Sequence, residues 1–370
     1  MHTWIEDAAP LAAWMNSHAA ATTIALDTEF MRTNTFRARL ALVQINLDDD
    51  IAVLDAPRLG DLAPLGARLR DPACVSVMHA ASEDLEALLP ILPQGPARLF
   101  DTQIAASMVG LGFGLSYQKL VFTLLGIDLP KAETRSDWLQ RPLTAAQLDY
   151  AAQDVEHLGL IHAMLAEKLA ALGRSDWHAE DCARLVERVC KTEPDAQPQR
   201  AFRGAAGWSH ENQALLRRVL LWRDATARAL DKPRPWILDD AHALGLVAQP
   251  PADAEELFER CKGQRALRGE QRRELLDMLH TPLQDADLDI APIPAAPTSA
   301  QKRQLATLRD EVTAIAQRLE LPEGLLCPRR HLETLVYDGV WPQGLDGWRK
   351  PLLRDALTVW SAETGTKPID

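Results

Sequence analysis

Two acidic side chains two residues apart, Asp27 and Glu29, have the types and the spacing to bind a metal ion. They follow an apolar run that starts at Ile24 after Thr22 and Thr23, a pattern typical of a buried strand. On a strand, side chains i and i+2 point to the same face, so both carboxylates should project together. Because neighbouring carboxylates repel each other, a hard cation such as Mg²⁺ or Mn²⁺ would stabilise the pair. Two ordinary surface acids at the end of a strand are the alternative.

The choice between these two interpretations depends on whether further acids could bind the same cation, and Asp84 and Asp154 are the candidates. Asp84 falls in the first turn of a helix that we expect to begin with Ser82 as its N-cap. The positive end of the helix dipole also stabilises a carboxylate at this position, so capping is the ordinary alternative. Asp154 lies one turn after Tyr150 in a helix expected over residues 144–172. Aspartate has poor helix propensity, so an ion pair, solvation or a metal ion would explain its presence in the middle of this helix.

The elements that must position these acids follow an α/β order. Residues 39–47 and 51–55 are strand-like, and the three aspartates at 48–50 predict a hairpin turn between them. With residues 22–30 they predict a three-stranded antiparallel meander. Short strands and helices then alternate to about residue 175, which indicates a mixed sheet flanked by helices.

The second half of the chain has a helical pattern interrupted by proline-containing segments. We expect an α/β domain and two helical domains, separated by linkers. Their bounds are 1–191 for the α/β domain, 192–209 for a linker, 210–280 for the first helical domain, 281–300 for a proline-rich linker and 301–370 for the second helical domain. The two helical blocks are similar in length and order, which is consistent with a diverged internal repeat.

The composition narrows the class of protein. A chain of 370 residues with 47% hydrophobic and 25% charged residues is typical of a globular protein with more than one core. Five widely spaced cysteines without a Cys-x-x-Cys pair favour a reducing compartment. Neither a signal segment nor a membrane-spanning run is evident, so we expect a cytoplasmic protein with no membrane partner. A net charge of −12 argues against nonspecific coating of nucleic acid.

Together the motifs resemble those of the DEDD exonucleases, in the branch whose third motif contains a tyrosine. The similar segments are Asp27-Thr-Glu-Phe, His79 with Asp84 five residues later, and Tyr150-Ala-Ala-Gln-Asp154. They look closest to the bacterial ribonuclease D family, as does the segment Arg135-Ser-Asp-Trp-Leu-Gln-Arg-Pro that precedes the third motif. Residues 210–280 resemble an HRDC domain, and residues 301–370 resemble a second, more diverged copy.

The resemblance implies a ribonuclease H-like exonuclease domain, a mixed sheet flanked by helices, followed by two small all-α HRDC-like domains. It also implies a 3′-5′ exoribonuclease that uses two divalent metal ions, Mg²⁺ or Mn²⁺, and releases nucleoside 5′-monophosphates. Asp27 would bridge both ions, Glu29 and Asp154 would complete the nucleophile side, and Asp84 would support the second ion. Tyr150 would orient the attacking water. The implied partners are RNA 3′ ends, on tRNA precursors and other small structured RNAs, and we expect a monomer.

Substrate contacts are implied at seven positions. These are Phe30, Met31, His79, Lys131, Arg135, Trp138 and Arg141. The apolar pair after the acidic strand would wedge against the terminal bases, and the cations and the tryptophan would hold phosphates or the terminal sugar. The ordinary alternatives are core packing for the apolar pair, loop anchoring for the loop residues and a structural role for the histidine.

Two other functions stay open. The same chemistry could act on DNA, because the catalytic strand does not read the 2′-hydroxyl by itself. A catalytically idle RNA-binding adaptor that uses its helical domains is the second alternative, although all five site residues are present. Matched RNA and DNA oligonucleotides, incubated with and without metal, would separate these functions.

Overall fold

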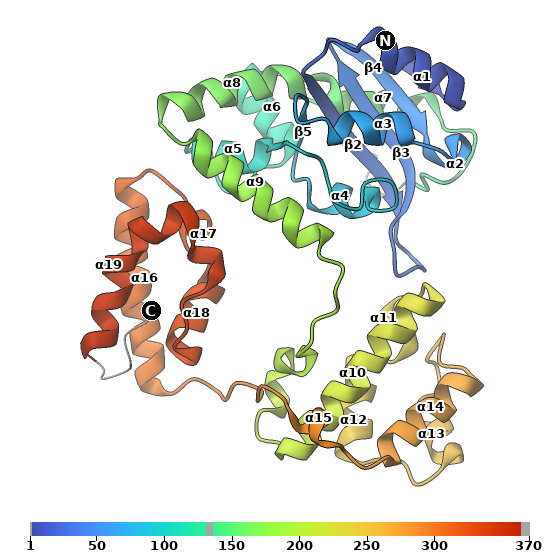
Figure 1. Cartoon of the computed structure of the whole chain (residues 1–370), viewed down its shortest axis with the longest axis vertical. Coiled ribbons are helices and arrows are strands. Elements are labelled where there is room, and N and C mark those ends of the chain that lie inside the picture. The colour runs from blue at the N-terminus through green and yellow to red at the C-terminus, as the bar shows by residue number, and fades with distance from the viewer. Residues whose placement is uncertain (1, 131–135, 364–370) are drawn as a thin grey trace. The chain divides into compact units, whose positions relative to one another are not determined.

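The computed structural model describes residues 2–130 and 136–363. The chain forms two compact units (Figure 1). The first unit contains residues 1–31, 39–191 and 299–370, and the second contains residues 32–38 and 192–298. The C-terminal helices therefore belong to the same unit as the N-terminal sheet, although more than one hundred residues separate them in sequence.

A six-stranded mixed sheet lies at the centre of the first unit, in the order β1-β4-β3-β2-β5-β6. Its strands are β1 (His2–Ile5), β2 (Thr23–Met31), β3 (Arg39–Leu47), β4 (Asp50–Asp55), β5 (Val75–Met78) and β6 (Leu99–Asp101). The antiparallel meander of β2, β3 and β4 is confirmed, whereas β1, β5 and β6 pair in parallel. Asp48 and Asp49 have φ of 53° and 66°, so the predicted hairpin turn has the left-handed backbone of a two-residue loop.

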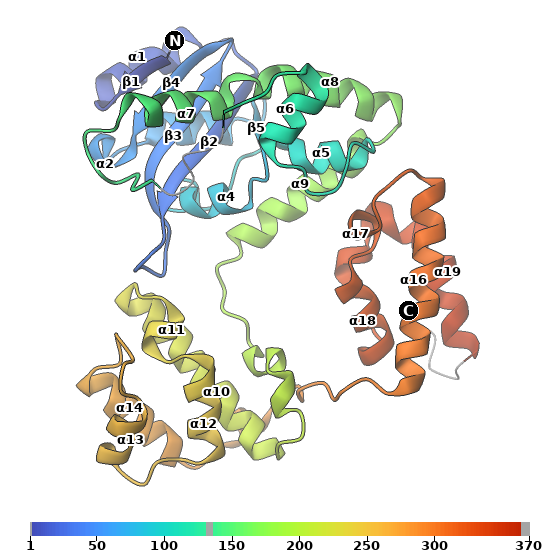
Figure 2. The same ribbon diagram turned by 180° about the vertical axis from the view of Figure 1, so that it is seen from behind.

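Helices cover both faces of this sheet (Figures 1 and 2). One face packs against α1 (Ala8–Ser17), α3 (Ala63–Arg70), α4 (Ser82–Leu88) and α9 (Ser175–Cys190). The other packs against α5 (Thr102–Met108), α6 (Tyr117–Leu125), α7 (Ala145–Glu156) and α8 (Leu158–Ala171). Strand alternation sends Ile24 and Leu26 into the first core and Ala25 into the second. Asp27 and Glu29 continue the Ala25 face, which is the face that α7 covers.

The single helix expected over residues 144–172 is two helices, α7 and α8, which meet at His157. The capping box of Thr144 and Gln147 that opens α7 is confirmed. Tyr117 provides hydrogen-bond partners for two backbone groups at the break. Its hydroxyl donates to the Gln153 carbonyl at 3.2 Å and accepts from the His157 N–H at 3.3 Å. The continuous prediction was wrong because the stabilising hydroxyl comes from another helix.

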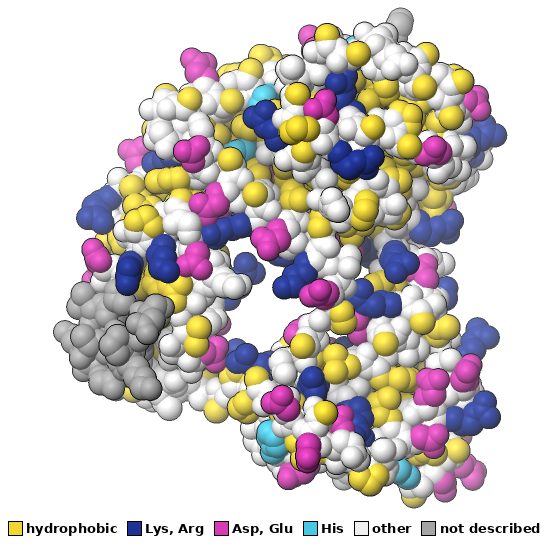
Figure 3. Space-filling view, viewed as in Figure 1, with side chains coloured by type: hydrophobic (Ala, Val, Ile, Leu, Met, Phe, Trp, Pro, Cys, Tyr) yellow, Lys and Arg dark blue, Asp and Glu magenta, His cyan; other side chains and the backbone are white. Residues whose placement is uncertain are grey.

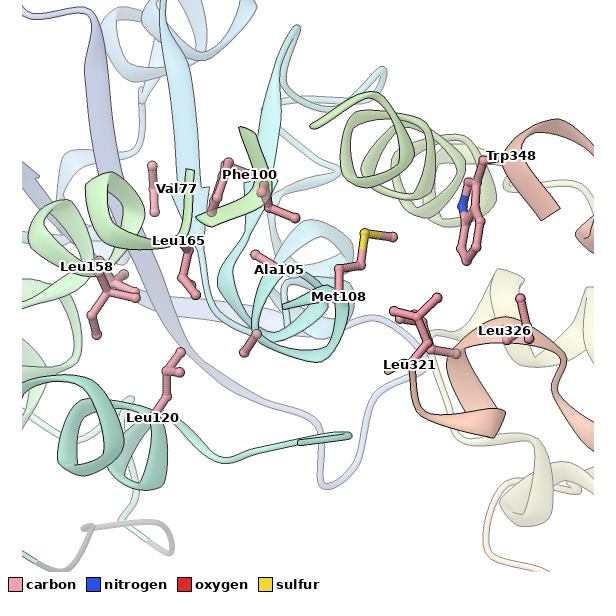
Figure 4. Packing of buried hydrophobic residues seen from close by; sticks show 14 of the residues in the cluster. Val77, Phe100, Ala105, Met108, Leu120, Leu158, Leu165, Leu321, Leu326 and Trp348 are labelled. Carbon is pink, nitrogen blue, oxygen red and sulfur yellow. The ribbon is translucent and has the colours of Figure 1, made fainter. Parts of the chain in front are cut away.

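The C-terminal helices pack against this α/β core. They are α16 (Ser299–Arg318), α17 (Glu323–Leu326), α18 (Arg329–Asp338) and α19 (Lys350–Glu363). Figure 4 shows Met108 of α5 extending toward Leu321 and Trp348 in one buried cluster. Arg349 binds both carboxylate oxygens of Asp181 on α9, at 2.5 and 2.7 Å, and both side chains are less than a tenth exposed. This region is therefore joined to the core by a shared hydrophobic cluster and a buried ion pair.

The second unit is helical in its described residues. Its helices are α10 (His210–Leu230), α11 (Arg234–Ile237), α12 (Asp240–Ala248), α13 (Ala254–Arg260), α14 (Gly269–His280) and α15 (Asp285–Leu288). The segments expected to be linkers pack against these helices. Gln199 is fully buried and donates to the Ala291 carbonyl at 2.9 Å, and the buried Ile293 donates its N–H to Gln213 Oε1 at 2.7 Å. Both segments thus extend the core of this unit. Among the described helices of the chain, none combines the length and the apolar composition that a membrane span requires.

Candidate active site

Strand β2 places two carboxylates on one side of the sheet. Asp27 and Glu29 lie opposite Gln44 and Leu42 of β3, and the pairing register shifts between Glu29 and Phe30. Such irregularities redirect side chains next to many active sites. The predicted common orientation of the two acids follows from the period of two in a strand.

Helix α7 brings a third carboxylate to this pair. One oxygen from each of Asp27, Glu29 and Asp154 lies within 4.8 Å of the other two, and all three residues are half-buried. Carboxylate oxygens at such spacing are the donors that Mg²⁺ and Mn²⁺ prefer. The structure therefore brings together one strand and one helix that are far apart in sequence.

Asp84 borders this group from helix α4. It is only 8% exposed, and its Oδ1 accepts a hydrogen bond of 2.6 Å from the hydroxyl of Thr28. Its charge raises the pKa of Asp27, of Glu29 and of Asp154, so it lies within electrostatic reach of all three. It is not part of the three-residue group within 4.8 Å. The expected N-cap at Ser82 was wrong by one residue, because Ala81 precedes the helix and no side chain caps it.

Burial and mutual repulsion hold protons on these acids. Burial, followed by the charges of its neighbours, raises the pKa of Asp27 well above its ordinary value. Burial is also the largest cause that raises the pKa of Glu29 to about 8, of Asp154 to about 7 and of Asp84 to about 6. Four carboxylates that cannot all ionise without a positive charge nearby fit the donor set of a divalent metal site.

Tyr150 lies one turn before Asp154, and its phenol is close enough to that carboxylate for each group to shift the pKa of the other. Burial and the charges of Asp154 and Glu29 raise the pKa of Tyr150 above its ordinary value. The phenol therefore stays protonated near neutral pH and acts as a hydrogen-bond donor. Trp138 stacks on its ring, with centroids 5.9 Å apart and planes inclined by 27°, and this fixes the orientation of the ring.

The raised pKa values predict how pH and metal act on stability. The pKa of each acid is higher in the folded chain than its unfolded value of about 4, so the folded state binds more protons between about pH 4 and pH 8. The metal-free protein should consequently lose stability as pH rises through that window. Because Mg²⁺ binds the ionised form, its addition should raise Tm more at about pH 8 than at about pH 5. Thermal unfolding with Mg²⁺ or chelator checks this, and an equal Mg²⁺ effect at both pH values would contradict it.

Two predicted substrate residues, Lys131 and Arg135, lie outside the described residues. Arg141 binds Asp55 through Nε at 2.7 Å and Nη2 at 2.9 Å, and its Nη1 donates to the Trp138 carbonyl at 2.7 Å. These contacts tie the loop to β4, and they support loop anchoring for Arg141 rather than a grip on phosphate.

Of the other predicted substrate contacts, two have structural roles within the protein and two stay predictions. His79 donates through Nε2 to the Leu115 carbonyl at 2.9 Å, and its Nδ1 lies 2.9 Å from the Thr102 hydroxyl, so both ring nitrogens are engaged within the protein. Trp138 is only 3% exposed and supports Tyr150. Phe30 and Met31 are half-buried directly after the acidic pair, and contact with terminal bases stays a prediction for both.

Sequence reasoning missed two residues that position the acids. Thr28 lies between Asp27 and Glu29 and points to the opposite face of β2, where it reaches Asp84. Strand alternation combined with the hydroxyl could have suggested this contact. Tyr117 supports the backbone next to Asp154, and its helix gives no sequence signal of that role.

Replacing Thr28 by Val should weaken metal binding at the site about 10- to 100-fold, as the loss of residues that orient metal ligands does. Val keeps the shape of Thr but removes the hydrogen bond to Asp84. The Mg²⁺ dependence of hydrolysis reports the change, with the exposed Thr22 replaced by Val as the matched control. An unchanged Mg²⁺ requirement in the Thr28 variant would remove this role.

Two protein families match parts of this chain. Residues 2–202 match the family described as 3′-5′ exonuclease, and residues 212–279 match the HRDC domain. Ribonuclease D of Xanthomonas oryzae pv. oryzae is 42% identical over 334 residues, which cover 89% of this chain and 90% of that protein. Ribonuclease D of Pseudomonas paraeruginosa is 35% identical over 380 residues, which cover 96% of each chain.

Two solved structures are similar over most of the chain. The crystal structure of Escherichia coli RNase D, described as an exoribonuclease involved in structured RNA processing, has a TM-score of 0.85 and 28% identity, covering 98% of this chain and 99% of that one. The catalytic core of RRP6 from Trypanosoma brucei has a TM-score of 0.61 and 22% identity, covering 75% of this chain and 79% of that one, and shares the fold.

Proposed function

This chain belongs to the ribonuclease D family and is a 3′-5′ exoribonuclease, and on that basis we propose that its acidic cluster would hold two divalent ions for the cleavage of RNA from the 3′ end. The proposal rests mainly on one observation, the three carboxylates of Asp27, Glu29 and Asp154 with oxygens within 4.8 Å of one another. Mg²⁺ or Mn²⁺ would supply an activated water near neutral pH and stabilise the charge on the leaving oxygen.

The residues of the cluster have distinct proposed roles. Asp27 would contact both ions, Glu29 and Asp154 would complete the ligands on the side of the attacking water, and Asp84 would support the second ion. Thr28 holds the Asp84 carboxylate in place. Tyr150 would orient the attacking water, since its protonated phenol lies near the Asp154 carboxylate. The product of each cycle would be a nucleoside 5′-monophosphate.

We propose tRNA precursors and other small structured RNAs as substrates. Relatives named ribonuclease D, and a solved relative described in structured RNA processing, support this class. The helical regions would then hold the body of the RNA while its 3′ end enters the acidic site. In the second unit, Arg218, Arg223 and Arg228 form ion pairs with aspartates of that unit, so its RNA contacts would have to come from other side chains.

The proposed organisation is an exonuclease domain over residues 1–191, an HRDC-like domain over 210–280 and a second, diverged HRDC-like domain over 301–370, with 192–209 and 281–300 between them. The match of residues 212–279 to the HRDC family supports the middle domain. We further propose that the protein acts as a monomer in the cytoplasm.

Matched RNA and DNA oligonucleotides labelled at the 5′ end test the function. In Mg²⁺ or Mn²⁺ the RNA should give a ladder of products shortened from the 3′ end together with mononucleotides, and chelator should stop the reaction. Equal rates on DNA would favour the DNA exonuclease alternative. Binding of RNA without cleavage in either metal would favour the adaptor.

A further inference from the structure

A cavity of about 410 Å³ lies within the first unit, between the α/β core and the C-terminal helices. Its core side is formed by the starts of α4 and α5 and by α9, and its other side by residues of α17, of α18 and of the segment before α19. Figure 3 shows basic, acidic and hydrophobic side chains mixed on the face of the molecule that is seen in Figure 1.

The two acidic side chains that line this cavity are engaged by donors within the protein. Asp181 is held by both terminal nitrogens of Arg349. Asp101 accepts hydrogen bonds from four backbone N–H groups, two before α4 and two at the start of α5. The Asp181 carboxylate thus has a cationic partner, and the Asp101 carboxylate caps the two helix starts.

The basic side chains of the cavity are only partly used. Arg184 pairs with Glu180 at 2.6 Å and donates to the Gly344 carbonyl at 3.1 Å. Arg188 of α9 and Arg330 of α18 are exposed, line the cavity from opposite sides, and form no ion pair or hydrogen bond through their side chains among the described residues. Two arginines from separate elements thus line one cavity, and neither guanidinium has an anionic partner among the described residues.

His331 lies in the positive potential of the arginines that line this cavity. It lines the cavity next to Arg330, and its ring has no hydrogen-bond partner within the described part of the chain. Burial is the first cause that lowers its pKa to about 4, and the charges of Arg330, Arg349 and Arg184 lower it further. The imidazole is therefore neutral at physiological pH and can donate one hydrogen bond into the cavity.

We propose that this cavity binds a backbone phosphate of the RNA substrate, upstream of the nucleotides that enter the acidic site. Arg188 and Arg330 would clamp the phosphate oxygens from two sides, and His331 would donate a third hydrogen bond. Guanidinium groups match phosphate geometry in this way, and phosphate contacts position nucleic acid without reading its sequence.

The position of the cavity supports an RNA phosphate as its occupant. Ala80 and Ser82 line it, and Asp84 lies on the same helical turn as Ser82, so the cavity and the acidic site share α4. An RNA strand anchored there would be held by the α/β core and the C-terminal helices at once. This inference rests on the proposed exoribonuclease function, because it assigns a second contact to the same substrate.

The test compares the double variant Arg188→Ala/Arg330→Ala with the wild-type full chain. Binding of a 5′-fluorescent RNA is measured by anisotropy in chelator over a range of salt concentrations, and KM and kcat are measured with Mg²⁺ on this RNA and on a dinucleotide. We expect RNA affinity to fall about 10- to 100-fold and the slope of log K against log salt to become shallower by about 0.7 for the lost single-strand phosphate. KM for the long RNA should rise relative to KM for the dinucleotide.

Arg329→Ala is the matched control, because Arg329 is the exposed neighbour of Arg330, pairs with Glu333 and does not line this cavity. The proposal is overturned if the double variant binds RNA with wild-type affinity and salt slope, or if Arg329→Ala has the same effect. A free-phosphate site would instead show as a rise in wild-type Tm with inorganic phosphate or AMP that the double variant lacks, with RNA binding unchanged, and this too would overturn it. If wild-type protein cleaves neither RNA nor dinucleotide, the proposed function itself fails.

Discussion

Asp154→Asn is expected to lower the single-turnover rate of RNA hydrolysis by about 10³-fold or more. The substitution keeps the size of the side chain but removes a charged oxygen ligand from the three-carboxylate group. Charge stabilisation by a bound ion is worth several kcal/mol in the transition state, which corresponds to a factor of this order. A 5′-labelled RNA under single-turnover conditions in saturating Mg²⁺ gives the rate.

Asp149→Asn is the control for this variant, because Asp149 is an exposed aspartate on the same helix α7. Removing one charge from a repulsive cluster should leave the metal-free Tm of Asp154→Asn unchanged or higher. The loss of rate would then reflect chemistry and not unfolding. A rate within a few-fold of wild type would remove Asp154 from the proposed metal site.

Tyr150→Phe is expected to slow the chemical step about 10- to 100-fold while changing RNA affinity little. The variant keeps the ring that stacks on Trp138 and removes only the hydroxyl that lies near the Asp154 carboxylate. A hydrogen bond to a charged group is worth about 1.5–3 kcal/mol, which gives this range. Single-turnover rates at several RNA concentrations separate the rate of chemistry from binding.

The pH profile of the same variant distinguishes two roles for the phenol. Since the pKa of Tyr150 is raised above its ordinary value, the phenol remains protonated at the near-neutral pH values over which the rate is measured. The pH dependence of Tyr150→Phe should therefore keep the shape of the wild-type profile at a lower rate. Loss of an alkaline limb in the variant would show instead that the tyrosine acts as a base.

The part of the site that follows local periodicity could be predicted directly. Asp27 and Glu29 share a face because the period of a strand is intrinsic to its backbone. The positions of Asp84 and Asp154 relative to that strand depend on how α4 and α7 pack. The sequence pattern alone therefore favoured capping for Asp84 and an ion pair or solvation for Asp154 over metal binding. Only the resemblance to a known family connected them with the strand.

Other features depend on partners that are distant in sequence. The break at His157 is stabilised by Tyr117, so an apolar pattern that runs through the break gave no sign of it. The proline-containing segment after residue 280 resembles a spacer by composition, yet Ile293 is buried in the second unit. The cluster that joins Met108 with Trp348 likewise arises only from tertiary packing. Because of this shared core, removing the C-terminal helices would expose buried surface.

Anomalous diffraction from crystals of the protein grown with Mn²⁺ and a short RNA would show whether Asp27, Glu29, Asp84 and Asp154 hold two divalent ions. We expect two manganese peaks, one within ligation distance, roughly 2–2.5 Å, of oxygens of Asp27, Glu29 and Asp154, and a second beside Asp27 and Asp84. Manganese bound only elsewhere, under conditions that support hydrolysis in solution, would contradict this two-ion site.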